Sequence, residues 1–228
     1  MRAAKRFAWI LVPAVAVGCA SKDRTPDATH DQPKAPLTKT AFDTEKEPPI
    51  KAETRFAAGQ LAETQNNPVN AMKQYEEAVK LKPDHVQALY RLGVVQAQLK
   101  LYPKAIETWK RYIKATHESA NGYANLGFCY ELSADTKLAE GAYQKGIAKD
   151  GKNQPCRVNY GLMLARQDRM TDAITNLRAV LTPAEVSYNI GSIQETRGRK
   201  EQAKAEYQKA LELDPSFDDA RQRLAALE

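Results

Sequence analysis

Glycine recurs in this chain at a fixed interval, and that interval limits the possible folds more than any other feature. Gly59, Gly93, Gly127 and Gly161 are each 34 residues apart, and Gly191 follows after a shorter interval of 30. Self-similarity at such a period is typical of a stacked array, in which each repeat is one small structural unit. We therefore predict five units, at residues 52–85, 86–119, 120–153, 154–183 and 184–217.

Each unit is predicted to contain two helices. In the second unit, large apolar residues recur at steps of three and four, which places them on one face of a helix: Leu89, Leu92, Val95 and Leu99. A second apolar set begins after Pro103, and proline is well tolerated in the first turn of a helix. Neither helix can bury its apolar face alone. The two helices must therefore pack together and then against the next pair.

Each unit has a glycine on its first predicted helix, and an alanine followed by a large residue on its second. A glycine in the middle of a helix costs roughly 1 kcal/mol relative to alanine, so a glycine at the same place in every unit needs a compensating contact. We expect close contact between helix backbones there. On the second helix, the facing places hold alanines (Ala71, Ala105, Ala139, Ala173, Ala203), followed one turn later by large side chains (Tyr75, Trp109, Tyr143, Leu177, Tyr207).

This combination of period and motif resembles the tetratricopeptide repeat (TPR), over residues 52–217. The fifth unit shows the family's glycine, alanine, aromatic and closing proline as Gly191, Ala203, Tyr207, Ala210 and Pro215. The departures are Arg55, Arg157 and Ser187 for a large apolar residue, His117 and Gly151 for the closing proline, and four residues missing near Thr182. The resemblance implies an all-α fold, a right-handed superhelical solenoid of five helix-turn-helix repeats. We expect a capping helix at 218–228 to close it.

The first eighteen residues are predicted to be a lipoprotein signal peptide. Basic residues near the start are followed by an apolar run at 7–17, which is shorter than the roughly 20 residues that a membrane-spanning helix needs. Residues 16–19 resemble a bacterial lipobox, which would make Cys19 the acylated, palmitate-carrying N-terminus. The alternative is an ordinary cleaved signal with a cut after Ala16, which would leave a soluble periplasmic protein. Because Ala20 follows the cysteine, resemblance to bacterial sorting rules implies an outer-membrane lipoprotein facing the periplasm.

Residues 19–51 are predicted to be a disordered tether. The segment is rich in proline, threonine, aspartate and lysine, and it has few large apolar residues. Such a composition cannot bury enough surface to offset the entropy lost on ordering. A flexible chain of this length reaches roughly 30 Å, so we expect the helical array to stand away from the membrane surface.

The charge of the chain excludes nucleic acid as a partner and leaves one basic region open to interpretation. The formal net charge is +6, and removal of three bases with the signal leaves 31 bases against 28 acids, or +3. This is far from the basic stripe that nucleic-acid binding needs. Bases concentrate in the second unit: Arg91, Lys100, Lys104, Lys110, Arg111 and Lys114. They form either a solvated outer face or a contact for an acidic partner or anionic lipid.

No arrangement of residues in the sequence predicts chemistry. His30, His85 and His117 are isolated, and the chain has no phosphate-binding glycine loop, nucleophile motif or zinc signature. We therefore predict a protein that is not an enzyme and has no cofactor, metal or small-molecule substrate. Cys129 and Cys156 lie about 10 Å apart along their helix axes, beyond the roughly 7 Å that a disulfide allows between Cα atoms, so we expect two free thiols.

The resemblance to the TPR family implies a protein-binding groove. In the family, the first helices line the concave side, and their second, fifth, ninth and twelfth residues face inward. Carried over, this gives Phe56, Tyr90, Val94, Phe128, Glu131, Leu162, Tyr188 and Glu195. We expect a partner's extended segment or helix to lay apolar side chains there, with the glutamates selecting a basic flank. For Phe128 and Leu162 the alternative is packing between neighbouring units. The family's two-carboxylate clamp is not matched, since only Arg166 could face inward.

These features favour a lipid-anchored protein-binding scaffold. The architecture resembles that of TPR lipoproteins in pilus biogenesis, so the leading hypothesis is assembly of an envelope machine such as a pilus or secretion apparatus. The alternative is an adaptor that recruits or regulates cell-wall hydrolases or proteases. A cytosolic type of cochaperone is disfavoured by the signal segment.

Overall fold

The computed structural model describes residues 50–227, and this part of the chain forms eleven α-helices and no strand. The predicted signal peptide, Cys19 and almost all of the predicted tether lie outside the described residues. Within residues 50–227, no helix has both the length and the apolar character needed to cross a bilayer.

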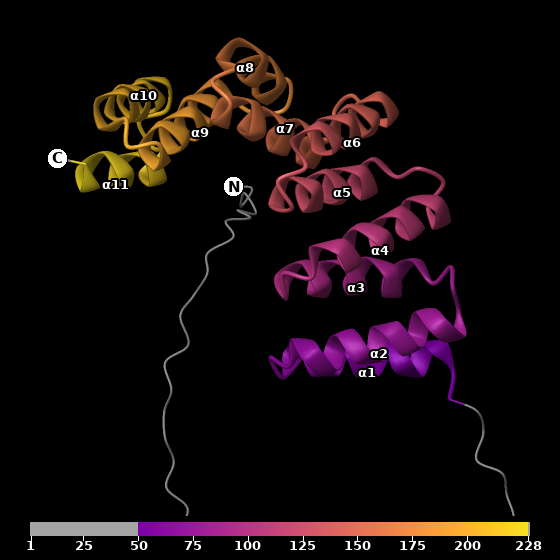
Figure 1. The fold of residues 1–228 in the computed structure, drawn as a ribbon. Coiled ribbons are helices and arrows are strands. Elements are labelled where there is room, and N and C mark those ends of the chain that lie inside the picture. Colours follow the sequence, from indigo (N-terminus) through magenta and orange to yellow (C-terminus); the bar gives the residue numbers. More distant parts are fainter. Residues whose placement is uncertain (1–49, 228) are drawn as a thin grey trace, which may run out of the picture. The chain divides into compact units, whose positions relative to one another are not determined.

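The helices follow one another in pairs, and each pair stacks on the one before it (Figure 1). The first helices of the pairs are α1 (Ala52–Thr64), α3 (Val86–Gln98), α5 (Ala120–Leu132), α7 (Gln154–Arg166) and α9 (Pro183–Thr196). The second helices are α2 (Pro68–Leu81), α4 (Tyr102–Ala115), α6 (Thr136–Lys149), α8 (Met170–Arg178) and α10 (Lys200–Leu213). A last helix, α11 (Asp218–Ala226), contacts α10. The predicted all-helical solenoid is confirmed.

One turn geometry joins the two helices of every pair. The five turns each place one residue in the left-handed region, with φ between 54° and 71°: Asn66, Lys100, Ala134, Asp168 and Gly198. The next residue's N–H bonds back to a carbonyl five residues earlier, as Leu101 does to Gln96 (2.8 Å) and Arg199 to Gln194 (2.9 Å). This bond is the one that closes a Schellman motif and satisfies an otherwise free helix carbonyl. It keeps the helices of every pair at a similar angle.

Four of the five recurring glycines make room for a ring, and the other, Gly161, lies against the side chain of Leu177. A Cβ atom added at Gly93 would lie 2.6 Å from the ring of Trp109, and one added at Gly127 would lie 2.6 Å from the ring of Tyr143. The large residue of each second helix is at most 1% exposed, and the alanine before it is completely buried. Our expectation of direct backbone contact was therefore wrong for these four units, because the ring itself lies on the glycine; at Gly161 the backbone oxygen of Ala173 does lie 3.1 Å from an added Cβ atom.

The fourth pair is shortened within its second helix. Helix α8 has nine residues, whereas the other second helices have fourteen. The next helix, α9, starts at Pro183, one residue before the predicted start of the fifth unit. Thr182 and Glu185 form a capping box there, in which each side chain bonds the other residue's backbone N–H. The missing residues thus shorten one helix and leave the stacking order intact.

The two cysteines and the last helix complete the core. Cys129 and Cys156 are free thiols, and both are buried. Burial raises the pKa of Cys129 to about 11 and that of Cys156 to about 12, so both thiols stay protonated and unreactive at neutral pH. On α11, Ala220 is buried while Arg221 is exposed, which is the arrangement expected of a helix that covers the end of the last pair.

Candidate protein-binding site

The first helices lie on the inner side of the stack. Helix α7 contacts both α5 and α9, whereas no two second helices within residues 50–227 make comparable contact. From α5 to α9, this closer spacing makes the first-helix side the concave one. The residues predicted to line a groove all belong to these first helices, so they are on the face where a partner would lie.

Three glutamates on this face already hold partners. They occupy equivalent places in α1, α5 and α9. Each accepts a hydrogen bond from the buried tyrosine of its own helix pair. Each also forms an ion pair with an arginine on a helix that follows that pair in the sequence. The trios are Glu63 with Tyr75 and Arg91, Glu131 with Tyr143 and Arg166, and Glu195 with Tyr207 and Arg223. The tyrosine hydroxyls lie 2.9, 3.4 and 2.6 Å from the respective carboxylates. Ion pairs thus link α1 to α3, α5 to α7 and α9 to α11.

The electrostatics of these trios change what the glutamates can do. Burial, reinforced by the glutamate, raises the pKa of Tyr75 to about 12 and also raises the pKa values of Tyr143 and Tyr207. The hydroxyls therefore remain protonated donors. Because each glutamate is balanced by an arginine, the expected selection of a basic flank by Glu131 and Glu195 loses its physical basis. Arg166 is occupied in the same way.

The side of the stack where α3 meets the third pair is apolar instead. Ala97 stands where the trios have glutamate, and no hydrogen bond or ion pair between α3 and α5 is found among residues 50–227. By contrast, α7 and α9 are joined by Arg197, which donates to the carbonyls of Ala165 and Arg166. Val94 and Ala97 instead pack against the apolar cluster that contains Leu126 of α5.

Large apolar side chains are exposed around this region. Tyr90 is 37% exposed, Phe128 42% and Leu132 41%. The Tyr90 ring meets the edge of Trp109 at 5.5 Å between centroids, which fixes its orientation. We call Tyr90, Val94, Phe128 and Leu132 the apolar patch. Exposed apolar side chains can mark an interaction site on a folded protein. Leu132 was missed by the sequence prediction, although it lies one helical turn after Phe128.

The other predicted groove residues act mainly as joints between neighbouring pairs. Phe56 lies 5.2 Å from the ring of His85, and Tyr188 lies 5.0 Å from the ring of Phe217. His85 lies directly before α3 and Phe217 directly before α11, so each ring contact joins a pair to the helix that follows it. Leu162 is half-buried against the core of the third to fifth pairs, so the packing alternative holds for Leu162 but not for the exposed Phe128.

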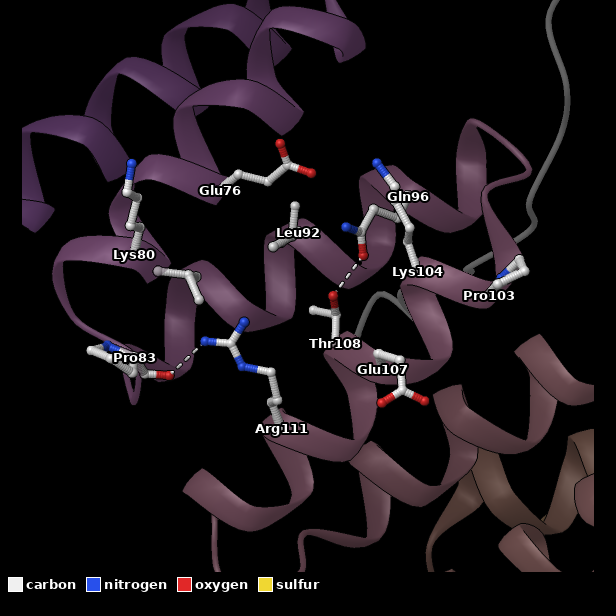
Figure 2. Close-up of a pocket in the computed structure, with 11 residues that line it drawn as sticks. Glu76, Lys80, Pro83, Leu92, Gln96, Pro103, Lys104, Glu107, Thr108 and Arg111 are labelled. Atoms are coloured by element: carbon white, nitrogen blue, oxygen red, sulfur yellow. Dashed lines mark hydrogen bonds between the residues drawn. The ribbon is translucent and has the colours of Figure 1, made fainter.

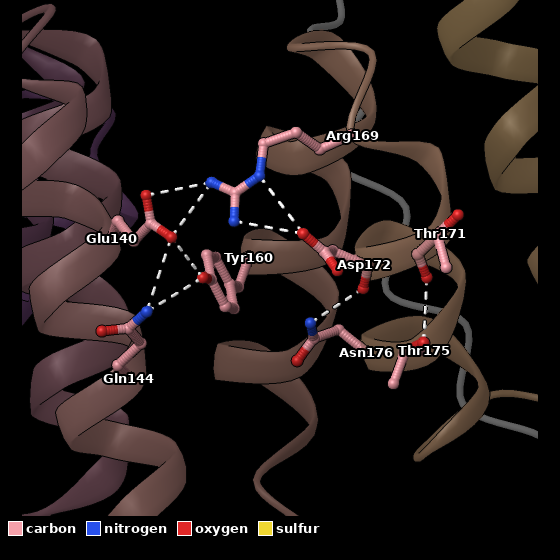
Figure 3. Close-up of polar contacts among 8 residues, drawn as sticks. All are labelled: Glu140, Gln144, Tyr160, Arg169, Thr171, Asp172, Thr175 and Asn176. Carbon is pink, nitrogen blue, oxygen red and sulfur yellow. Dashed lines mark hydrogen bonds and ion pairs between the residues drawn. The ribbon is translucent and has the colours of Figure 1, made fainter.

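A polar network fills the outer side between α6 and α8 (Figure 3). The hydroxyl of Tyr160, on α7, donates to Glu140 at 2.6 Å, and Gln144 donates to the Tyr160 oxygen at 3.1 Å. Arg169 pairs with both Glu140 and Asp172 at 3.1 Å. The Tyr160 hydrogen bond, together with Arg169, holds the pKa of Glu140 below its ordinary value. Three helices are thereby tied together through one carboxylate.

Replacing Glu140 with glutamine should make stability less dependent on pH in acid. Since the pKa of Glu140 is lowered by folding, its stabilising effect is complete above its ordinary pKa and is lost as the pH falls through the lowered value. We expect Glu140→Gln to cost about 1 kcal/mol at pH 7 and clearly less at about pH 3. Urea unfolding at both pH values measures this. Glu212→Gln, at an exposed residue, is the control, and a Glu140→Gln deficit equal at both pH values would contradict the assignment.

No group of three or more histidine, cysteine, aspartate or glutamate side chains within residues 50–227 is arranged to hold a metal ion. What the first helices present is an apolar patch beside internally balanced ion pairs.

Comparison with known proteins identifies the repeat. Sequence profiles described as tetratricopeptide repeat match residues 56–120 and 184–217. The type IV pilus assembly protein PilF of Pseudomonas aeruginosa is 27% identical over 132 residues, which are 55% of this chain and 52% of PilF. The chain spans between 13% and 52% of the length of the curated relatives that it matches.

Solved structures show the same fold. TTC0263, a TPR protein of Thermus thermophilus, is 23% identical and superposes with a TM-score of 0.56, covering 77% of this chain and 98% of that protein. YrrB, described as a TPR protein with an unusual peptide-binding site, is 21% identical with a TM-score of 0.53, covering 76% and 91%. The repeat profiles and the solenoid of helix pairs agree that this chain is built of tetratricopeptide repeats, and proteins of this repeat family act as protein-interaction scaffolds.

Proposed function

We propose that this protein is a lipid-anchored scaffold, facing the periplasm, that holds a protein partner during assembly of an envelope machine such as a pilus or secretion apparatus. Two observations support the process and the place. The similarity to PilF, a pilus assembly protein, extends over 55% of the chain. The sequence around Cys19 resembles a lipobox that follows a short apolar run. An outer-membrane location is part of the proposal.

The apolar patch carries the proposal. Its three exposed side chains, Tyr90, Phe128 and Leu132, gain most from burial, because removing apolar surface from water contributes roughly 25 cal/mol per Å². The neighbouring ion pair of Glu131 with Arg166 is already balanced, so it offers no net charge to a partner. The patch therefore suits an extended segment or helix whose contact side is apolar.

The test is a double substitution in the patch. Phe128→Ala with Leu132→Ala should abolish capture of a pilus or secretion component by a photoreactive residue at position 90 in living cells, and it should reduce the assembled machine. The fold should persist, because both side chains are about 40% exposed. Leu138→Ala, on α6, removes a side chain that is 53% exposed and serves as the matched control.

Three outcomes would contradict the proposal. Equal loss of capture with Leu138→Ala would remove the patch from it. Normal pili and secretion with altered muropeptides in a deletion strain would favour the adaptor of cell-wall hydrolases or proteases. Palmitate labelling that persists in Cys19→Ala would remove the lipid anchor.

A further inference from the structure

The outer side of the first two pairs contains an open groove (Figure 2). Its walls are α2 and α4, its floor is α3, and its volume is about 720 Å³. Leu92 and Val79 supply the apolar part of the lining, and Figure 2 shows Glu76 and Lys104 on opposite walls. The groove lies between second helices, so it is separate from the apolar patch on the inner side.

The repeat provides an internal comparison for this groove. Tyr160 of α7 occupies the place that Leu92 has in α3, immediately before the recurring glycine. There the larger ring and the Glu140 and Arg169 pair fill the corresponding space between α6 and α8 (Figure 3). Between α8 and α10, where Ile190 takes the same place, the corresponding groove holds only about 160 Å³. The opening between α2 and α4 is therefore set by particular side chains and is not a general property of the repeat.

Polar groups with unused hydrogen-bonding capacity face this groove. Gln96 is 3% exposed, and its carbonyl oxygen accepts from Thr108 at 2.7 Å while its amide nitrogen makes no hydrogen bond. The carboxylate of Glu76 is half-buried and has neither a hydrogen-bond donor nor an ion-pair partner in residues 50–227. Both groups line the open groove, where a ligand can reach them. A ligand that offers both a donor and an acceptor would satisfy the two groups together.

Positive charge dominates the free groups on the groove walls. Lys104 makes no ion pair among the described residues, and Arg111 donates only to the carbonyl of Pro83, at 3.2 Å. The acidic Glu107 is already paired with Lys110 at 2.7 Å. Two bases on α4, Lys104 and Arg111, therefore face the groove without an ion-pair partner in residues 50–227. Beside them lie the apolar floor, the Gln96 amide donor and, on the other wall, the Glu76 acceptor.

We propose that this groove binds an extended, acidic segment of a partner protein. A peptide backbone carries alternating N–H and C=O groups, which match the Glu76 carboxylate and the Gln96 amide. Side chains of an extended chain point alternately to opposite sides. One apolar side chain can then rest on Leu92, while acidic side chains reach Lys104 and Arg111. Acidic segments are held by arginine and lysine through charge-assisted hydrogen bonds.

A peptide fits this groove better than an anionic lipid does. A phosphate group offers the Glu76 carboxylate no hydrogen-bond donor, whereas a peptide backbone brings N–H groups to it. A phospholipid headgroup would also leave the Gln96 amide with at most one partner on a floor that is otherwise apolar.

The proposal is tested by peptide binding to the full chain. The probe is a fluorescent twelve-residue peptide that alternates leucine with glutamate, followed by anisotropy. We expect Lys104→Glu with Arg111→Glu to weaken its binding at least tenfold. Lys114→Glu, at an exposed base of the same helix outside the groove, should change binding less than twofold. A separate variant, Leu92→Tyr, reproduces the residue that fills the equivalent place and should also reduce binding at least tenfold, with its helical circular dichroism unchanged.

Several results would overturn the proposal. One is equally strong binding of a peptide that alternates leucine with lysine. Another is binding of the acidic peptide that Leu92→Tyr leaves intact. A third is binding to phosphatidylglycerol vesicles that requires Lys104 and Arg111 while the acidic peptide does not bind. A fourth is self-association in sedimentation that the same double reversal abolishes, which would make a second copy the occupant. None of these results depends on the apolar patch.

Discussion

Replacing Gly93 with alanine should lower the free energy of unfolding by about 1 to 3 kcal/mol, although alanine is the better helix former. The new Cβ would lie 2.6 Å from the ring of Trp109. That ring is 1% exposed and is held by the rings of Tyr90 and Tyr112, each 5.5 Å away between centroids, so it cannot move aside. The overpacking therefore outweighs the gain of roughly 1 kcal/mol in helix propensity.

The matched control for this substitution is Gly141→Ala in the middle of α6. A Cβ added at Gly141 would meet no atom within 4 Å. The same chemical change should therefore stabilise the protein, by about 0.5 to 1 kcal/mol, because only the helix propensity changes. Urea unfolding followed by circular dichroism measures both variants. If the two substitutions shift stability in the same direction, the contact between glycine and ring does not set the register of the repeat.

The period of the glycines was enough to predict the fold. The interval of 34 residues and the apolar faces of the helices predicted five helix pairs, and the helices appear where those faces were assigned. What the period could not show is the contact that each glycine makes. The distance between Gly93 and Trp109 in sequence is the same whether the ring or the helix backbone fills the space. Only the packed structure distinguishes the two.

The candidate site was predicted less completely than the fold. The inward row was drawn from the resemblance, and Tyr90 and Phe128 are indeed exposed. The sequence prediction treated the glutamates as free to bind a basic flank of a partner. It missed the arginines that balance them, because these arginines belong to a helix that follows each pair. For Glu63 and Glu195 the partner lies 28 residues later in each case, at Arg91 and Arg223. That equal spacing is a signal the sequence contains.

The two faces of the stack differ because side chains differ at equivalent places. On the outer side, Leu92 leaves a groove where Tyr160 closes one. On the inner side, Ala97 leaves an apolar region where Glu131 forms a trio. Since one turn geometry joins the helices of every pair, we expect specificity for partners to depend on these local substitutions. Both open regions involve α3, which makes the second pair the part of the chain with the most capacity to bind.

Replacing Trp109 with alanine should have the largest effect of any single substitution in this pair, a loss of about 3 to 5 kcal/mol. The indole is the largest fully buried side chain, and it fills the space above Gly93. Its ring N–H has no hydrogen-bond partner, so its removal leaves no polar group unsatisfied and the loss reflects packing alone. Neighbouring rings at Tyr90 and Tyr112 cannot fill the cavity without leaving their own contacts.

The position of the second pair adds a further consequence to Trp109→Ala. In a repeat array each pair contacts only its neighbours, so a weak pair in the interior uncouples those on either side. We expect the urea transition to broaden and the amides of α1 and α2 to exchange hydrogen faster than those of α9 and α10. Tyr90→Ala is the control, because its ring touches the same indole but is 37% exposed, and it should cost at most about 1.5 kcal/mol. A Trp109→Ala protein that unfolds in one sharp transition, with the stability of Tyr90→Ala, would show that the Trp109 ring does not hold the second pair together.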